Sequence, residues 1–357
     1  MSMIHEGLPL MRVISRPSTA RCTLAMYVSF LLSEPHSPTG NRLAEVMEIS
    51  HDSVNRFLLR EDYTPRDLFE EVRSGLTLKG GTVSVDDSVL DKPYSQLMAF
   101  VGYFWSGKHH GVVKGINLMT LYYTDPHGRH QPINYRIYDK TANKTKNDYF
   151  QEMLVEVLAW GLQPAWVTGD SWYSSTANLK MIKNHHRGFL FALESNRLVA
   201  IEPGRWLQVQ QLAIPEHGLR VHLRGFGTVK VFRKWLKNQP RHYALYPPND
   251  EEWDAVDRPA FLKLHDQHWH IEQYHRALKQ ACHIEHFQVR QPTAIRNHLF
   301  AAICGYVQLQ RLQATDLLGN CYRLQRELFN EVMATFIHAF IPNLEHLNPQ
   351  LQPPVNA

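Results

Sequence analysis

The hydrophobic pattern divides the chain into a helical start, a central stretch of strands and helices, and a helical end. Residues 1–78 carry apolar positions at helical spacing. From Gly80 onward, short apolar runs bounded by turn residues predict strands, which alternate with helical segments in the order β-β-β-α-β-α-β. That order is typical of a mixed sheet flanked by helices, so we predict an α/β fold.

The same pattern predicts five segments. They are a helical N-terminal domain (1–78), the first part of an α/β core (79–199), a β-rich insertion of short strands (200–257), the second part of the core with a long helix (258–312), and a C-terminal helix and tail (313–357). We expect the tail to be frayed from Asn343 onward, because it is rich in Pro and Asn.

Within the helical start, residues 41–58 have the pattern of a helix-turn-helix: a short helix, a tight turn at 48–50 and a second helix. The second helix would present His51, Asn55 and Arg56 to a DNA major groove. An ordinary helical hairpin would have the same pattern, and this segment alone does not decide between the two.

Composition narrows the function classes only slightly. The chain has 357 residues and 44% hydrophobic content, enough for a large core, and Lys plus Arg exceed Asp plus Glu by 38 to 34. This mild basicity is consistent with a nucleic-acid partner. The four cysteines are widely spaced without a CxxC pair, which predicts a reduced, cytoplasmic protein. The apolar stretch 22–32 is too short to span a bilayer, so we expect no membrane partner.

Acidic residues supply the candidate chemistry. Two strand-like runs end in aspartate, at Asp86-Asp87 and at Asp170, and a helical segment carries Glu272 and Lys279. Carboxylates at the ends of parallel strands can converge, and oxygen ligands suit Mg²⁺ or Mn²⁺. Two such ions can clamp a phosphodiester and activate a water or a DNA 3′-hydroxyl. The pattern therefore favours polynucleotidyl transfer.

Two choices among the carboxylates remain open at this level. An apolar run followed by Asp-x-Ser favours Asp86, whereas strand alternation with Val83 and Val85 favours Asp87. We take Asp86 as the ligand and Asp87 as its alternative. Glu285 lacks a lysine seven residues further on, so we predict a surface charge there rather than the third carboxylate.

With these motifs, the chain resembles the DDE transposases of bacterial insertion sequences, in the branch with a β-rich insertion before the catalytic glutamate. The resemblance rests on Asp86-Asp87-Ser88, on Gly169-Asp170-Ser171-Trp172-Tyr173, and on Glu272 with Lys279. Between Asp86 and Asp170 lie 83 residues, and 101 lie between Asp170 and Glu272, an interval long enough for an inserted domain. The resemblance covers roughly residues 80–300.

That branch often carries the signature Tyr-x2-Arg-x3-Glu-x6-Lys. Here the Glu-x6-Lys half is intact, but His265 and His268 stand at the Tyr and Arg positions. The resemblance implies that Lys279, His268 and His265 bind DNA phosphates. Arg276, one turn after Glu272, would replace the missing guanidinium.

The resemblance also implies an RNase H-like core and cut-and-paste movement of a DNA element. Asp86, Asp170 and Glu272 would hold two Mg²⁺ (or Mn²⁺) ions per active site. The expected partners are double-stranded DNA, as terminal inverted repeats and as target, and a second copy of the chain in a homodimer. The expected location is the bacterial cytoplasm, at the nucleoid. The alternatives are an RNase H-like nuclease without strand transfer and a catalytically inactive DNA-binding relative.

Two other groups of residues suggest chemistry more weakly. The histidines between His265 and His286 match no closed tetrahedral zinc pattern, so we predict polar or phosphate-facing histidines. Trp206 and Trp235 in the insertion would either pack in a small β core or stack on a flipped DNA base.

Overall fold

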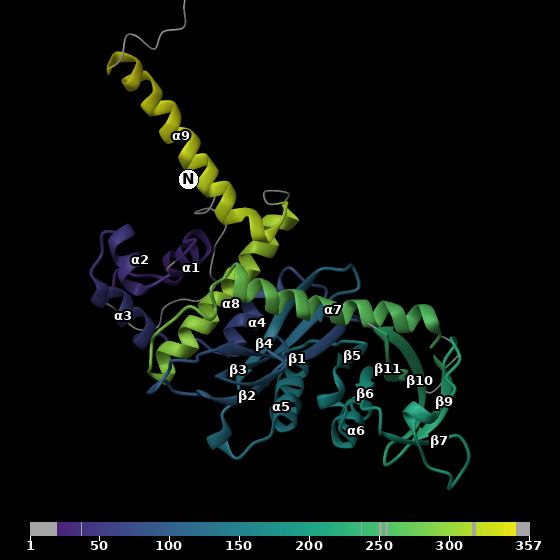
Figure 1. Cartoon of the computed structure of the whole chain (residues 1–357). Coiled ribbons are helices and arrows are strands. Elements are labelled where there is room, and N and C mark those ends of the chain that lie inside the picture. Colours follow the sequence, from purple (N-terminus) through teal and green to yellow (C-terminus); the bar gives the residue numbers. More distant parts are fainter. Residues whose placement is uncertain are drawn as a thin grey trace, which may run out of the picture.

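The computed structural model describes residues 20–36, 38–236, 238–249, 252–253, 256–315 and 319–347, in which a large mixed sheet carries helices on both faces (Figure 1). The helices are α1 (Leu24–Ser33), α2 (Gly40–Val46), α3 (His51–Arg60), α4 (Pro65–Arg73), α5 (Lys146–Ala159), α6 (Thr176–Asn184), α7 (Arg258–Gln280), α8 (Pro292–Ala314) and α9 (Leu324–Leu347). The strands are β1 (Thr82–Asp91), β2 (Gly102–Ser106), β3 (Gly111–Thr124), β4 (His130–Ile137), β5 (Trp166–Gly169), β6 (Gly188–Leu193), β7 (Leu198–Ala200), β8 (Leu207–Gln208), β9 (Leu219–Leu223), β10 (Gly227–Leu236) and β11 (Gln239–Tyr246).

One sheet connects all of these strands, in the order β2-β3-β1-β5-β6-β11-β10-β9-β7-β8, with β4 beside β3. β1, β5 and β6 are parallel to one another, whereas β3 and β11 run antiparallel to their neighbours β1 and β6. The strands of the predicted insertion therefore continue the main sheet through the β6–β11 pairing.

β1 differs from its predicted form. The sequence pattern placed Asp86 and Asp87 at the end of the first strand, but β1 continues through both residues to Asp91. The reason is that β3 pairs with β1 along its whole length, from Thr82 to Asp91, and so keeps the backbone extended beyond the last apolar position.

The N-terminal helices pack on α8. Asn297 of α8 donates hydrogen bonds to the carbonyls of Leu58 and Glu61, and Tyr27 of α1 shares a hydrogen bond of 2.8 Å with His298. These contacts are buried, so they tie the helices α1 and α3 to the rest of the chain. Residues 1–19 of the predicted N-terminal segment lie outside the described residues.

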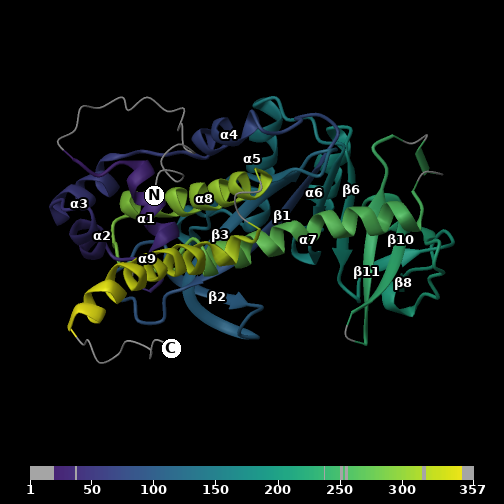
Figure 2. The same cartoon turned by 90° about the horizontal axis from the view of Figure 1, so that it is seen from above.

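At the other end of the chain, α9 projects away from the sheet (Figures 1 and 2). The predicted fraying from Asn343 is wrong for the first residues concerned, because α9 continues to Leu347. The rest of the predicted tail, residues 348–357, lies outside the described part of the chain. Within the described ranges, no helix has the length and apolar character needed to cross a membrane.

Candidate active site

Strand register brings two of the predicted carboxylates together. β1 and β5 are parallel, and Val85 and Gly169 form their last pair. Asp86 and Asp170 each follow this pair directly, so they lie side by side where the two strands part. Beyond this point β1 continues along β3, while the chain after β5 turns into the short helix Ser171–Tyr173.

Asp86 is a partly buried carboxylate on the face of the sheet that α7 covers. Its Oδ1 atom accepts a hydrogen bond of 2.8 Å from the backbone N–H of Asp87, and its Oδ2 atom lies 3.4 Å from Nδ1 of His275. Burial, followed by the charge of Asp87, raises the pKa of Asp86 to about 7. Burial also lowers the pKa of His275 to about 4, so His275 is neutral at pH 7 and does not neutralise Asp86.

Asp170 combines a local role with a place beside Asp86. Its Oδ1 atom accepts a hydrogen bond of 2.9 Å from the backbone N–H of Trp172 and so caps the short helix. Burial, followed by the charges of Asp86 and Asp87, raises the pKa of Asp170 to about 7. Capping the short helix does not require Asp170 to lie close to the carboxylates of Asp86 and Asp87. Its position beside them therefore indicates a role for Asp170 in addition to the cap.

α7 supplies the third carboxylate. The helix begins behind the N-cap Asp257 and runs across the sheet (Figure 2). The Glu272 side chain is exposed, but neighbouring protein atoms partly desolvate its carboxylate. This desolvation, followed by the charge of Asp86, raises the pKa of Glu272. Asp86 thus interacts electrostatically with both Asp170 and Glu272.

Asp87 points to the opposite face of the sheet, as alternation along a strand requires. Its carboxylate accepts hydrogen bonds from Lys146 Nζ (2.7 Å), Tyr173 Oη (2.8 Å) and Asn117 Nδ2 (2.5 Å). Both oxygens of Asp87 are therefore engaged in contacts with the protein. Asp86 is the aspartate that lies on the same side as Glu272.

Lys279 lies two turns after Glu272, and its ammonium is held beside β1. Its Nζ atom donates a hydrogen bond of 2.6 Å to the Val89 carbonyl and forms an ion pair of 3.0 Å with Glu285. The prediction that Glu285 is a surface charge is wrong, because its side chain is only 14% exposed. The chain turns back toward β1 after α7, which brings Glu285 against Lys279 and against the backbone N–H of Asp91.

His265 and His268 contact strands. Nδ1 of His268 lies 3.2 Å from the Thr168 hydroxyl, and burial lowers the pKa of His268 to about 4. His265 lies 3.0 Å from Lys234 Nζ and 3.4 Å from the Tyr243 hydroxyl, and burial lowers its pKa as well. Both imidazoles are thus neutral at pH 7 and fasten α7 to the sheet, and the positive charge beside His265 belongs to the Lys234 ammonium.

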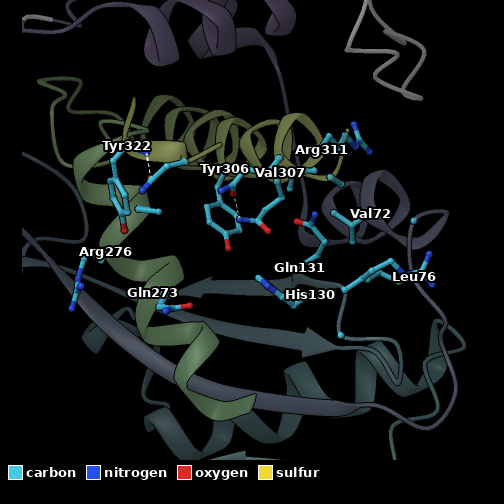
Figure 3. Close-up of a pocket in the computed structure, with 18 of the residues that line it drawn as sticks. Val72, Leu76, His130, Gln131, Gln273, Arg276, Tyr306, Val307, Arg311 and Tyr322 are labelled. Atoms are coloured by element: carbon cyan, nitrogen blue, oxygen red, sulfur yellow. Dashed lines mark hydrogen bonds between the residues drawn. The ribbon is translucent and has the colours of Figure 1, made fainter. Parts of the chain in front are cut away.

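Arg276 has a different environment. It is exposed one turn after Glu272, and its guanidinium makes no hydrogen bond or ion pair with the described residues. It lies at the margin of a cavity of about 730 Å³ between α7 and α8, and it points away from the other labelled side chains in Figure 3. This cavity includes none of the three carboxylates, so we place the chemistry outside it.

The predicted DNA-reading residues lie on α3, which Ser50 caps. His51 and Arg56 are exposed, and Asn55 Nδ2 lies 3.1 Å from Nδ1 of His51. The opposite face of the helix is buried, with Phe57 in the core. α3 therefore keeps a polar outer surface.

The donor set suits a divalent cation. Desolvation raises the pKa of all three carboxylates, and the charge of Asp86 raises the pKa values of Asp170 and Glu272 further. Such carboxylates offer hard oxygen ligands and an excess of negative charge, which a divalent ion would offset. In the described ranges, no group of three His, Cys, Asp or Glu side chains already has the spacing to bind a metal ion. Glu272 is exposed, so its side chain can change rotamer toward a shared ligand.

Sequence reasoning missed two residues of this site. His275 follows Glu272 by three positions, a spacing that puts both on one face of a helix and could have identified it. The Nε2 atom of His275 is buried without a partner among the described residues. Lys146, the partner of Asp87, carries no sequence signal, because 59 positions separate the two residues.

Comparisons with known proteins concern the family and the fold of the chain. The family model described as "Transposase DDE domain" matches residues 79–308. Among solved structures, the chain is similar to a piggyBac transposase in a synaptic complex with hairpin DNA, with 15% identity, a TM-score of 0.50, and coverage of 97% of this chain and 80% of that one. At this identity, the likeness concerns the fold alone.

A weaker likeness links the chain to the Drosophila P element transposase in a strand transfer complex. The identity is 10%, the TM-score is 0.29, and the match covers 56% of this chain and 49% of that one. No curated protein matches the chain.

Proposed function

The chain belongs to the family of transposase DDE domains, and from this premise we propose that it cuts and rejoins DNA at the ends of an insertion sequence by a cut-and-paste route. The observation that carries the proposal is the register of β1 and β5, which sets Asp86 beside Asp170 within electrostatic reach of Glu272. Carboxylates in this arrangement repel one another unless cations lie between them.

We assign the metal-binding role to Asp86, Asp170 and Glu272. Two Mg²⁺ or Mn²⁺ ions bound there would activate the attacking water or 3′-hydroxyl and stabilise the leaving oxygen. Asp86 is preferred over Asp87, because both oxygens of Asp87 are already hydrogen-bonded.

Two cations on α7 would position the DNA. Arg276 is exposed beside Glu272 and would bind a phosphate directly. Lys279 would bind a second phosphate while Glu285 and the Val89 carbonyl restrain its ammonium. His265 and His268 would act indirectly, by holding α7 on the sheet.

The remaining assignments follow from the same proposal. An RNase H-like core would comprise residues 79–199 and 258–312, interrupted by the β-rich insertion 200–257. The N-terminal segment would bind the terminal inverted repeats through α3, and two copies of the chain would pair the two ends of the element. Such a protein would act on the bacterial nucleoid.

The test is cleavage of a labelled duplex that carries the terminal inverted repeat, with Mg²⁺ or Mn²⁺. Asp170→Asn and Glu272→Gln should abolish cutting while duplex binding persists, and Glu152→Gln, a surface change on α5, should leave cutting unchanged. Cutting that survives both site substitutions would refute the site. Cutting without joining of the 3′ ends to a target plasmid would identify a nuclease instead.

A further inference from the structure

A two-stranded arm lies at one edge of the sheet. β2 pairs with β3 from Gly102–Gly115 to Ser106–Gly111. β1 reaches this part of β3 only at Gly115, and β4 begins its pairing at Leu118. Residues 102–106 and 111–114 therefore extend beyond both neighbouring strands (Figure 2).

The two faces of the arm differ. Phe104 is buried and packs edge-on against Tyr138, with ring centroids 5.9 Å apart. On the other face, Tyr103 and Trp105 are 64% and 66% exposed, and the cross-strand partner of Trp105, Val112, is 64% exposed. Two large aromatic side chains, two positions apart on a strand, thus present their rings to solvent on one face.

This exposed surface continues beyond the arm. Lys114, the cross-strand partner of Tyr103, donates a hydrogen bond to the Ser95 carbonyl. Next to Ser95, Tyr94 is 95% exposed and lines a cavity of about 440 Å³ together with Arg290. We call Tyr94, Tyr103, Trp105, Val112 and Arg290 the arm surface.

The charge of the arm surface is positive. Arg290 is exposed, and its guanidinium makes no hydrogen bond or ion pair with the described residues. Asp91, a carboxylate that lines the same cavity, is ion-paired with Lys108 at 3.1 Å. Exposed aromatic rings together with an unpaired guanidinium favour a ligand with flat bases and a phosphate backbone.

We propose that the arm surface binds an unpaired stretch of a DNA strand, whose bases stack on Tyr103 and Trp105 while Arg290 contacts its phosphates. Bases within a duplex cannot reach exposed rings in this way, since their faces are already stacked. The inference rests on the proposed function, because it names where a strand that leaves the carboxylates is held.

A second protein strand is a poorer occupant of the open edge of β2. Lys140 donates a hydrogen bond of 2.7 Å from its Nζ atom to the Tyr103 carbonyl, so part of the edge is already blocked by an ammonium group. Lysines at sheet edges discourage strand pairing. The exposed rings, by contrast, are unobstructed.

The strand register also gives the distance along the sheet between Asp86 and Trp105. Asp86 pairs with Thr120, and Trp105 pairs with Val112, so both side chains lie on the same face of the sheet. The eight positions from Thr120 to Val112 span about 26 Å at about 3.3 Å per residue. At the rise of duplex DNA, about 3.4 Å per nucleotide, this length corresponds to about eight nucleotides, and an unpaired strand, which extends further per nucleotide, covers it with fewer.

The first experiment measures affinity for a fluorescent 20-nucleotide oligo(dT) and for a duplex of equal length, without metal. Trp105→Ala and Tyr103→Ala should each weaken oligo(dT) binding about five-fold to a hundred-fold and change duplex binding by less than about two-fold. Trp105→Phe should restore most of the loss. Phe329→Ala, which removes an equally exposed ring from α9, should have no effect.

A second experiment uses the distance. Terminal-repeat duplexes would carry an overhang of one or twelve thymidines on either strand, and Trp105→Ala should weaken binding only of a twelve-nucleotide overhang. Unchanged oligo(dT) affinity in both alanine variants would overturn the proposal. The proposal would also be overturned if the alanine variants lost self-association in sedimentation while their oligo(dT) affinity stayed unchanged, because the arm surface would then be a protein interface.

The outcomes separate the two proposals. Oligo(dT) binding requires neither metal nor an element end, so it can be measured independently of cleavage. If the wild type never cuts DNA but Trp105→Ala weakens oligo(dT) binding, the proposed function is refuted and the role of the arm surface is supported. If the wild type cuts DNA in a metal-dependent way but the substitutions at Tyr103 and Trp105 leave oligo(dT) affinity unchanged, the proposed function is supported and the role of the arm surface is refuted.

Discussion

Asp86 and Asp87 are neighbours on β1, but their carboxylates lie in opposite environments on the two faces of the sheet. Asp87 faces α5 and accepts hydrogen bonds from Lys146, Tyr173 and Asn117. Asp86 faces α7, where its neighbours are the carboxylates of Asp170 and Glu272 and a neutral imidazole.

The difference separates a structural carboxylate from a ligand carboxylate. A buried charge is stable when donors surround it, as at Asp87. At Asp86 the protein itself provides too little positive charge, so the raised pKa marks a position suited to an external cation. If this distinction is correct, substitutions on the two faces will have opposite consequences.

The largest contrast is expected in catalysis. Asp86→Asn should lower the rate of single-turnover cleavage at least about a thousandfold, equivalent to about 4 kcal/mol, because a metal ligand is lost. Asp87→Asn should stay within about tenfold of the wild type when it is assayed below its melting temperature. The reverse order would make Asp87 the ligand.

The next contrast concerns stability and pH in the presence of EDTA. The pKa of Asp86 is raised from its ordinary 3.8 to about 7 in the fold, which favours its protonated form there. This group therefore contributes most stability below about pH 4, and the contribution is lost as the pH rises toward about 7. Asp86→Asn should melt higher than the wild type at pH 8, with a smaller difference at pH 5. A variant that melts lower at pH 8 would contradict the assigned repulsion.

On the other face, removal of the cation should destabilise the protein. Lys146→Met leaves the mostly buried Asp87 without its charged partner and should lower the free energy of unfolding by about 3 kcal/mol. Lys144→Met, which breaks an exposed ion pair between the segment before α5 and Glu152 on α5, is the matched control and should cost less than about 1 kcal/mol. Urea denaturation measures both, and equal losses would show that the burial of Asp87 is unimportant.

The smallest effect should come from metal binding itself. Mg²⁺ or Mn²⁺ at about ten times its dissociation constant should stabilise the wild type by about 1.4 kcal/mol. A thermal shift with and without EDTA should register this gain in Asp87→Asn but not in Asp86→Asn. A shift retained in Asp86→Asn would place the ion elsewhere.

Several elements of the site were predictable from local pattern. Alternating apolar runs predicted β1 and β5, and the helical spacing of Glu272 and Lys279 predicted one face of α7. Local pattern could not predict that Lys279 pairs with Glu285, because that contact depends on how the chain turns after α7. The strand β2 was missed altogether, because its central residues Tyr103, Phe104 and Trp105 are all aromatic and show no alternation of apolar and polar positions.

The histidines show the same limit. His265 and His268 were predicted to bind phosphate from their place in a motif, a role that suits a charged, exposed ring. Packing against β5, β10 and β11 leaves both rings only partly exposed and lowers their pKa values. Burial is a property of the assembled sheet, and no local sequence feature reports it.

By itself, the sequence determined most of the alternation of strands and helices, although not β2, together with the three candidate carboxylates and the resemblance that joins them. These depend on residue type and on spacing along the chain. The tertiary structure decided which of two adjacent aspartates faces Glu272. It also decided that the strands of residues 198–246 extend the main sheet and that aromatic rings lie exposed on the arm. These properties depend on pairings between residues distant in sequence, and such pairings are set by the free energy of the whole assembled sheet.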